Sequence, residues 1–166
     1  MDDNARKFII EPLALGFLKE HNATSFVLTT DWLETNEDTE RKLVYKKYET
    51  GEVAILLITK VTKEGKRVSE KNKITEQEYT KLLTSAILRV EKRRYEFNFP
   101  QGDVVFSIKY DEFINSDLKI LEVDASGEIE RNKFDPKDFL VTLKEVTGDI
   151  RYYGYRIAGV LFSEEN

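Results

Sequence analysis

The sequence predicts a mainly β fold with a few helices (α+β), in which an antiparallel sheet closes on itself into a barrel with a polar interior. Strand-like runs of alternating apolar and polar residues follow one another along the chain, and glycine-containing turns such as "ETGE" and "KEGK" separate them. Several runs also carry charges on a face that would otherwise be apolar. A closed sheet would bring such faces together in its interior.

The first half of the chain is expected to hold a short strand at residues 6–10 and a helix at residues 11–21. Four strands follow, at residues 24–33, 40–49, 52–61 and 66–74. A second helix is marked by Thr75 as N-cap and by Glu78, which completes a capping box. Its apolar stripe is expected to run on to Ile87.

The second half is expected to continue with strands at residues 89–99, 103–113 and 118–125. A short helix is expected at residues 135–140, because Asp135 precedes a proline at the first helical position. The last segment, residues 148–161, is expected to be helical despite its glycines. His21, the only histidine, is expected to be a charge partner of the preceding helix C-terminus.

The composition predicts one folded domain over residues 1–166, with 40% hydrophobic residues to form its core. The absence of cysteine excludes disulfides, thiolate catalysis and Cys-based metal sites. A formal net charge of -5 argues against a general nucleic-acid coat. With no apolar run that would span a bilayer and a charged N-terminus, neither a membrane nor export is expected, and a cytoplasmic location is predicted.

The stretch "VEKRRYEF" places cations close together within a predicted strand. Lys92, Arg94 and Glu96 would share one face, while Tyr95 and Phe97 would share an aromatic core face. Neighbouring cations repel unless water or a bound anion compensates, so removing the charge of Arg94 is not expected to lower stability. The alternative is a solvated edge strand, whose charges discourage aggregation.

Other strands carry charges in a similar way. Lys60 follows two apolar residues on one strand face, Glu70 and Asn72 share a face, and so do Glu122 and Asp124. Lys60 could instead extend to solvent from a strand end, and the acids could be ordinary surface residues. If these faces line one interior, a ligand with phosphate oxygens and a metal would compensate their charges.

Five stretches carry a resemblance over almost the whole chain and in the right order. They are "LLITK", "GKRVSEKN", "VEKRRY", "LKILEVD" and "LKEVTGDIRYYGYRIA". Together they resemble the CYTH superfamily, the triphosphate tunnel metalloenzymes, which include class IV adenylate cyclases, thiamine triphosphatases and inorganic triphosphatases. The resemblance implies a closed eight-stranded antiparallel tunnel that binds triphosphate and uses a divalent metal, Mg²⁺ or Mn²⁺.

The chain departs from the family pattern at several carboxylates. The Glu-x-Glu-x-Lys start of the family aligns with "DNARK", which keeps Lys7 but has Ala5 at the central carboxylate. Asn72 replaces the second acid of another Glu-x-Glu. The aspartate usual in the strand before the last pair aligns with Lys109, although Asp111 would restore it in a shifted alignment.

The resemblance implies the site residues. The catalytic residues would be Lys7, Glu70, Glu122 and Asp124, of which Glu70, Glu122 and Asp124 would hold the metal. The substrate-binding cations would be Lys7, Arg41, Lys46, Lys60, Lys92 and Arg94.

The predicted function is metal-dependent hydrolysis of inorganic, nucleoside or thiamine triphosphate in a basic tunnel. The alternative is a binding module that has lost efficient catalysis and senses polyphosphate or a nucleotide, and the replaced carboxylates favour it. A class IV adenylate cyclase is disfavoured, because nothing in the sequence identifies an adenine pocket. The expected partner is a small-molecule triphosphate or polyphosphate, and a homodimer is left open.

Overall fold

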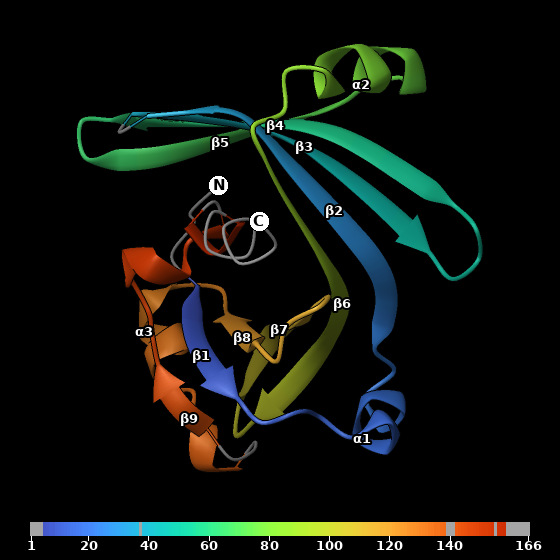
Figure 1. The fold of residues 1–166 in the computed structure, drawn as a ribbon. Coiled ribbons are helices and arrows are strands. Elements are labelled where there is room, and N and C mark those ends of the chain that lie inside the picture. The colour runs from blue at the N-terminus through green and yellow to red at the C-terminus, as the bar shows by residue number, and fades with distance from the viewer. Residues whose placement is uncertain (1–4, 37, 139–141, 155, 159–166) are drawn as a thin grey trace. The chain divides into compact units, whose positions relative to one another are not determined.

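The computed structural model describes residues 5–36, 38–138, 142–154 and 156–158. Their strands form one nine-stranded sheet in the order β5-β4-β3-β2-β6-β7-β8-β1-β9 (Figure 1). The predicted mainly β class with an antiparallel sheet is confirmed. The predicted closed eight-stranded barrel is not, because β5 and β9 are the two edges of this strand order and no pairing between the described parts of these strands closes it.

The composition of β5 (Lys66–Lys73) gives a physical reason for the open edge. Five of its eight residues are charged, namely Lys66, Arg67, Glu70, Lys71 and Lys73. Charged side chains on an edge strand discourage a further strand from pairing with it. The same pattern that suggested a charged barrel interior is therefore typical of an unpaired edge.

The chain divides into two compact units, and each is described by itself. Of the described residues, unit 1 contains Val27–Lys92 and the segment from Ile150, and unit 2 contains residues 5–26 together with Arg93–Asp149. Strands β2 (Thr24–Thr35) and β6 (Leu88–Gln101) contribute residues to both units. The single domain predicted for residues 1–166 stays a prediction.

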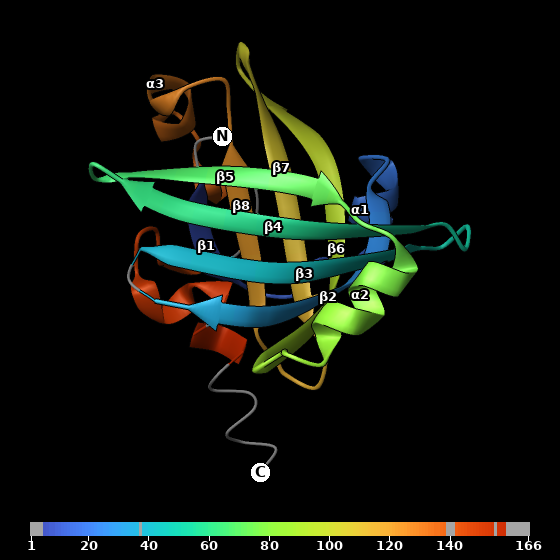
Figure 2. The same ribbon diagram turned by 90° about the horizontal axis from the view of Figure 1, so that it is seen from above.

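In unit 1, the strands β3 (Thr39–Tyr48), β4 (Val53–Lys63) and β5 pair antiparallel, next to β2 (Figure 2). The turn between β4 and β5 has positive φ at both central residues, 52° at Glu64 and 76° at Gly65. Such a two-residue turn matches the twist of the strands and fixes their register. Lys63 therefore lies opposite Lys66, and each pair further along the hairpin follows from this one.

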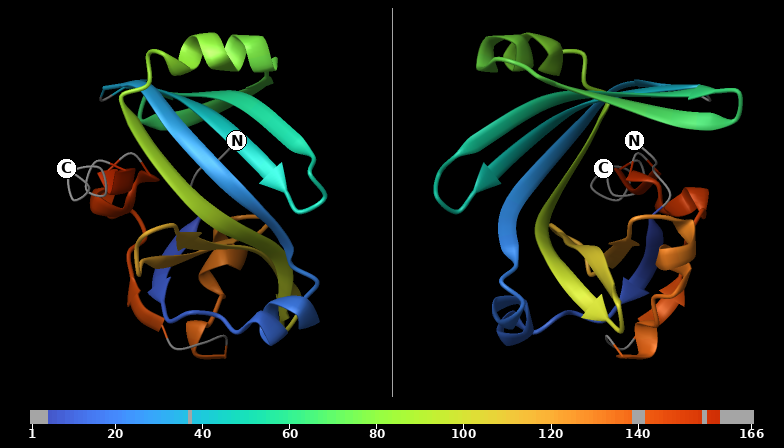
Figure 3. Two further views of the ribbon diagram at one scale, coloured as in Figure 1. Left: turned by 45° about the vertical axis from the view of Figure 1, so that its right-hand side comes forward. Right: turned by 180° about the vertical axis from the view of Figure 1, so that it is seen from behind.

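The helix α2 (Glu76–Leu83) lies against one face of this sheet (Figures 1 and 3). The predicted capping box of Thr75 and Glu78 is confirmed. The Tyr79 ring packs 5.4 Å from that of Tyr45 on β3. The helix does not extend to Ile87 as predicted, because the Ile87 backbone N–H donates to the Trp32 carbonyl at 2.8 Å and starts the return into β6.

The C-terminal segment of unit 1 is helical in two short pieces. The first is the 3-10 turn η2 (Ile150–Tyr152), and the second comprises Gly154 and residues 156–158. A Cβ on Gly154 would lie 3.0 Å from Trp32 Cζ2, so a larger residue here would need the buried Trp32 ring to shift by a few tenths of an ångström. The predicted helix is thus confirmed in part, and residues 155 and 159–161 lie outside the described residues.

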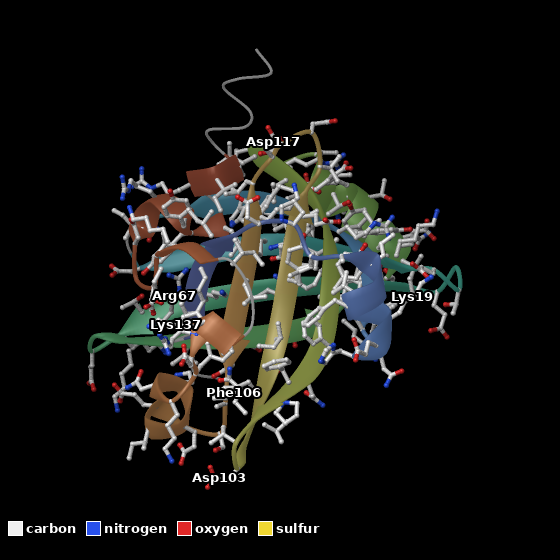
Figure 4. The ribbon with its side chains drawn as sticks, turned by 90° about the horizontal axis from the view of Figure 1, so that it is seen from below. Lys19, Arg67, Asp103, Phe106, Asp117 and Lys137 are labelled. Atoms are coloured by element: carbon white, nitrogen blue, oxygen red, sulfur yellow. The ribbon has the colours of Figure 1, made fainter. Side chains whose placement is uncertain are left out.

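In unit 2, β7 (Val104–Phe113) pairs with β8 (Lys119–Asp124), which pairs with β1 (Arg6–Ile10). On its other side β1 pairs with β9 (Thr142–Glu145), a strand that the sequence did not predict. In Figure 4, Asp103 and Asp117 mark the turns before and after β7.

Three short helices complete unit 2. They are α1 (Leu15–Glu20), α3 (Glu128–Asn132) and the 3-10 turn η1 (Pro136–Asp138). The helix α1 begins four residues later than predicted, and α3 was not predicted. The turn η1 lies within the helix predicted at residues 135–140, of which residues 139–140 lie outside the described part. No described helix is long and apolar enough to cross a membrane.

The core of unit 2 lies on one face of its strands. Phe8, Ile108, Tyr110 and Val123 are buried there with at most 1% of their surface exposed. Phe97 joins this core, and Tyr95 and Phe99 pack against it. The predicted aromatic core face of β6 is therefore confirmed. By strand alternation, the opposite face carries Lys7 of β1, Lys109 and Asp111 of β7, and Glu122 and Asp124 of β8.

Candidate functional site

One face of β3, β4 and β5 in unit 1 gathers positive charges from all three strands. Residues directly opposite each other in antiparallel strands point to the same side of the sheet, so the register places each side chain. This face, the basic face, carries Lys42, Lys46, Lys60, Arg67, Lys71 and Lys73. Glu40 is the one carboxylate that these described strands add to it, so six cations and one carboxylate give a formal charge of +5.

The cations of the basic face follow one another in rows. Lys60 lies opposite Ser69, and in the next row Lys42 and Lys71 flank Ile58. Successive rows on one face of a strand are about 7 Å apart. The face therefore presents a ladder of positive charges along the strands.

Glu40 organises one end of this ladder. It is only 6% exposed, and its carboxylate accepts a hydrogen bond from Trp32 Nε1 at 2.6 Å and another from Arg67 Nη2. Lys42 Nζ lies 3.9 Å from the same carboxylate. The Arg67 guanidinium also lies 5.8 Å from the centre of the Tyr153 ring. Glu40 thus fixes the positions of two cations, Arg67 and Lys42.

Ser69 adds a hydroxyl group to the basic face. Its Oγ is buried and has no hydrogen-bond partner among the described residues. A buried hydroxyl without a partner is unfavourable, and it can donate to a bound oxygen anion. Because Ser69 lies opposite Lys60, such an anion would meet a charge and a hydroxyl in the same row.

The structure divides the predicted site residues of unit 1 between two faces. Lys46 and Lys60 lie on the basic face, whereas Arg41 and Glu70 lie on the opposite face, each paired with Thr59. Arg41 Nη1 forms an ion pair with Glu34 at 3.1 Å. The physical reason is strand alternation, because side chains an odd number of positions apart in one strand point to opposite faces of the sheet. Arg41 and Glu70 therefore do not join the predicted site residues Lys46 and Lys60.

The remaining charges of the opposite face are more scattered. Lys47 lies near one end of β3, and Lys63 and Lys66 stand at the tip of the β4–β5 hairpin. Lys92, a predicted substrate-binding residue, lies half-buried on β6 at the boundary of unit 1. The sequence interpretation missed Lys42, Lys71 and Lys73 and gave Arg67 no role in the site. The turn "KEGK" and alternation from Lys60 would have placed Arg67, Lys71 and Lys73 on one face, whereas Lys42 also needs the register of β3 with β4.

In unit 2, a charged strip crosses β1, β8 and β7. Glu122 lies between Lys7 and Lys109, and Lys7 Nζ lies 3.9 Å from its carboxylate. Asp124 lies two residues further on the same face of β8. Its Oδ1 accepts hydrogen bonds from the Ala125 backbone at 2.9 Å and from Arg131 Nη1 at 3.4 Å. Both predicted carboxylates are thus held beside cations.

Arg94 belongs to the same strip and is tied to Asp111. Its Nε and Nη2 donate to the two carboxylate oxygens at 2.7 and 2.8 Å, and the side chains are 13% and 1% exposed. Burial disfavours the charge of Arg94, but the charge and hydrogen bonds of Asp111 outweigh it and raise the Arg94 pKa. The expectation of uncompensated repulsion at Arg94 is therefore wrong. The bidentate pair leaves Nη1 as the donor with which Arg94 could reach a ligand.

The two units differ in how their charges are balanced. The charged strip contains three cations and three carboxylates, namely Lys7, Arg94, Lys109, Asp111, Glu122 and Asp124. The basic face has six cations and a single carboxylate. Among these described strand residues, the excess of positive charge therefore lies on the basic face.

The predicted metal ligands are only partly brought together. Within the described residues, no group of three or more His, Asp or Glu side chains could hold a metal ion. Glu122 and Asp124 share one face of β8 and suit Mg²⁺, which often takes one or two protein carboxylates together with phosphate oxygens. Glu70, in unit 1, points away from the basic face of its own unit.

Comparisons with known proteins give structural matches only. No protein-family model matches the sequence, and no curated protein matches it. The hypothetical protein NE1496 superposes with a TM-score of 0.64 over 93% of this chain and 95% of that one, at 24% sequence identity. The chain shares the fold of NE1496. At this level of identity, the likeness shows the fold alone.

Two further solved structures are more distant. A "putative adenylate cyclase (bh2851)" from Bacillus halodurans gives a TM-score of 0.49 and 9% identity, covering 79% of this chain and 84% of that one. PH1012 from Pyrococcus horikoshii OT3 gives a TM-score of 0.44 and 16% sequence identity, and the match covers 78% of this chain and 84% of that one. Both TM-scores are too low to establish a shared fold.

Proposed function

We propose that the chain binds a triphosphate or a polyphosphate on the basic face of unit 1. The observation that carries this proposal is the ladder of six cations against the single carboxylate of Glu40. Cations on one sheet face repel each other, and a linear polyanion relieves this repulsion along its whole length. The sequence resemblance to the CYTH superfamily implies the same class of ligand.

The kinds of side chain on the basic face suit phosphate oxygens. The lysines act as point charges, Arg67 offers a planar fork of N–H donors, and Ser69 offers a hydroxyl. Glu40 holds Arg67 and Lys42 in place and lowers the net positive charge of this face by one. The net charge of -5 for the whole chain disfavours long nucleic acids and favours a small anionic compound.

Metal-dependent hydrolysis of a triphosphate bound in unit 2 is a second candidate, favoured by the Glu122 and Asp124 carboxylates beside Lys7. These two carboxylates would hold Mg²⁺ or Mn²⁺. A bound divalent ion would neutralise charge on the phosphate oxygens and on the leaving group. Lys7 would hold Glu122 in place and contribute a positive charge to a phosphate bound there.

Calorimetry with inorganic triphosphate and longer polyphosphate tests the proposal, with and without Mg²⁺ or Mn²⁺, beside an assay of phosphate release. Saturable binding without release supports the binding module. Metal-dependent release that Glu122→Gln abolishes supports the hydrolase as well. Absence of binding to both compounds under all conditions would contradict the proposal.

A further inference from the structure

The helix α2 lies outermost on unit 1 (Figures 1 and 3). It packs on the sheet face opposite the basic face, because its Tyr79 contacts Tyr45, which alternates with Lys46 along β3. None of the eight residues of α2 is buried, and its apolar side chains Leu82 and Leu83 are only half-buried. The described residues of unit 1 therefore leave much of the α2 surface open to a partner.

The outward side of α2 is polar and exposed. Its residues are one, four and five positions apart, so they lie on one side of the helix. They line an open hollow of about 500 Å³ and are Glu76, Gln77, Thr80 and Lys81. Among the described residues, neither Glu76 nor Lys81 forms an ion pair. Both charges are therefore available to a partner.

This outward side is complementary to itself in the antiparallel direction. If two copies of α2 cross at their midpoints on a two-fold axis, Glu76 of each copy lies beside Lys81 of the other. Gln77 of each then lies beside Thr80 of the other, so that an amide meets a hydroxyl. The antiparallel arrangement also brings the positive end of each helix dipole beside the negative end of the other. A parallel arrangement would instead place like charges together.

Exposed apolar residues stand at both ends of α2. Val53 is 44% exposed and precedes Ile55 by two positions on β4, and the Ile55 carbonyl accepts a hydrogen bond from Ile74 just before the helix. Ile87 follows the helix and is 56% exposed. The same two-fold axis brings the Val53 end of one copy to the Ile87 end of the other. Apolar surface at both ends would thus be removed from water.

We propose that α2 is the contact through which two copies of this chain form an antiparallel, two-fold dimer. The apolar ends supply the buried surface, and the pairs of Glu76 with Lys81 fix the register and exclude the parallel arrangement. The contact is small for a dimer interface, so the dissociation constant is expected to be on the order of 10 µM. Because the basic face lies on the other side of the sheet, the dimer leaves it open, and the contact is independent of triphosphate binding.

Sedimentation velocity of the full chain over a range of concentrations tests this contact. Wild type should pass from monomer to dimer, and Glu76→Lys and Lys81→Glu should each weaken the dimer at least about tenfold, because each places like charges together twice. An equimolar mixture of the two variants should restore the wild-type affinity, since each chain then meets opposite charges. Lys66→Glu, a charge reversal at the tip of the β4–β5 hairpin, should leave the affinity unchanged.

A wild type that stays monomeric up to about 200 µM would overturn the proposal. Equal dimer affinity in wild type and both charge-reversed variants would also overturn it, as would a mixture of the two folded variants that stays monomeric. If a charge-reversed variant does not fold, Val53→Gln/Ile87→Gln decides, because it changes the apolar ends outside the helix. A weaker dimer in this variant supports the contact, and an unchanged dimer overturns it.

Discussion

Arg94 shows how one buried partner changes the role of a charged residue. Asp111 is almost completely buried, and each of its carboxylate oxygens accepts a hydrogen bond from Arg94. Replacing Arg94 with Met removes two hydrogen bonds and a positive charge from this buried carboxylate, so we predict a loss of about 3–5 kcal/mol in the free energy of unfolding, measured by urea titration. The double variant Arg94→Met/Asp111→Leu should recover much of the loss. Equal stability of the single variant and wild type would contradict this prediction and support the sequence-based expectation that Arg94 is repelled by neighbouring cations.

Glu40 is predicted to stabilise the fold at the expense of anion binding. Glu40→Gln keeps an acceptor for Trp32 but weakens the contacts with Arg67 and Lys42. We expect the free energy of unfolding to fall by about 1.5–3 kcal/mol, the usual contribution of a hydrogen bond to a charged group. Because the basic face gains one net positive charge, the affinity for inorganic triphosphate should rise in calorimetry. A variant with lower stability and lower affinity would show that Glu40 instead prepares the cations for binding.

At the residue scale, part of the candidate site was predictable from strand alternation alone. Arg41 and Lys46 are five residues apart in one strand, so they could not both have faced the same ligand. Asp111 as the partner of Arg94 could not be predicted in this way. Its identification needs the register of β6 with β7, which the two-residue turn Gly102-Asp103 sets so that Arg94 lies opposite Asp111.

The capping box of α2 gives a prediction at the scale of an element. Thr75 Oγ1 accepts from the Glu78 backbone at 3.1 Å, and Thr75→Ala removes this bond from the first turn. We predict a loss of about 1 kcal/mol in thermal or urea unfolding. Thr80→Ala is the matched control, because that hydroxyl bonds only the Glu76 carbonyl within the helix and alanine is a better helix former. Similar losses of stability in both variants would show that the capping hydrogen bond contributes no more than an ordinary hydroxyl within the helix.

The pairing of β1 with β9 should depend on pH through Glu145. Hydrogen bonds from Arg6 hold the Glu145 pKa below its ordinary value, against the smaller effect of burial, and Thr147 adds to the lowering. A lowered folded-state pKa stabilises the fold above the unfolded-state pKa of about 4.3, and this contribution is lost as the pH falls through the folded-state value.

We therefore expect Glu145→Gln to cost about 0.5–1 kcal/mol at neutral pH, a value reduced because Glu145 is 43% exposed. The difference from wild type should shrink in strongly acidic urea titrations. A difference that stays constant with pH would contradict the role of the ion pair.

Among the elements, those with strong local signals were predicted and those that depend on distant partners were missed. The capping box and the alternating strands are written in neighbouring residues, so α2 and the strands up to β8 were located with small shifts at their ends. The strand β9 has four residues and is stabilised by pairing with β1, more than a hundred residues away. Such a short segment carries too little pattern of its own to be identified.

At the scale of the whole molecule, opposite charges are segregated. The chain has a net charge of -5, yet one face of unit 1 carries six cations and one carboxylate. Composition alone could exclude a nucleic-acid coat but could not locate this face, because it depends on the register of three strands. The sequence did predict phosphate binding, and the basic face supports it with a set of cations that overlaps the predicted set only at Lys46 and Lys60.

The central claim is that triphosphate binds the basic face, and a matched pair of double variants tests it most directly. Lys60→Gln/Lys71→Gln removes two charges from this face, whereas Arg41→Gln/Lys47→Gln removes two from the opposite face of the same sheet. In calorimetry with inorganic triphosphate, we predict that the first variant binds at least about tenfold more weakly and the second within about twofold of wild type, since a charge-assisted contact is lost only in the first. Equal weakening in both variants, or a larger loss in the second, would contradict the account.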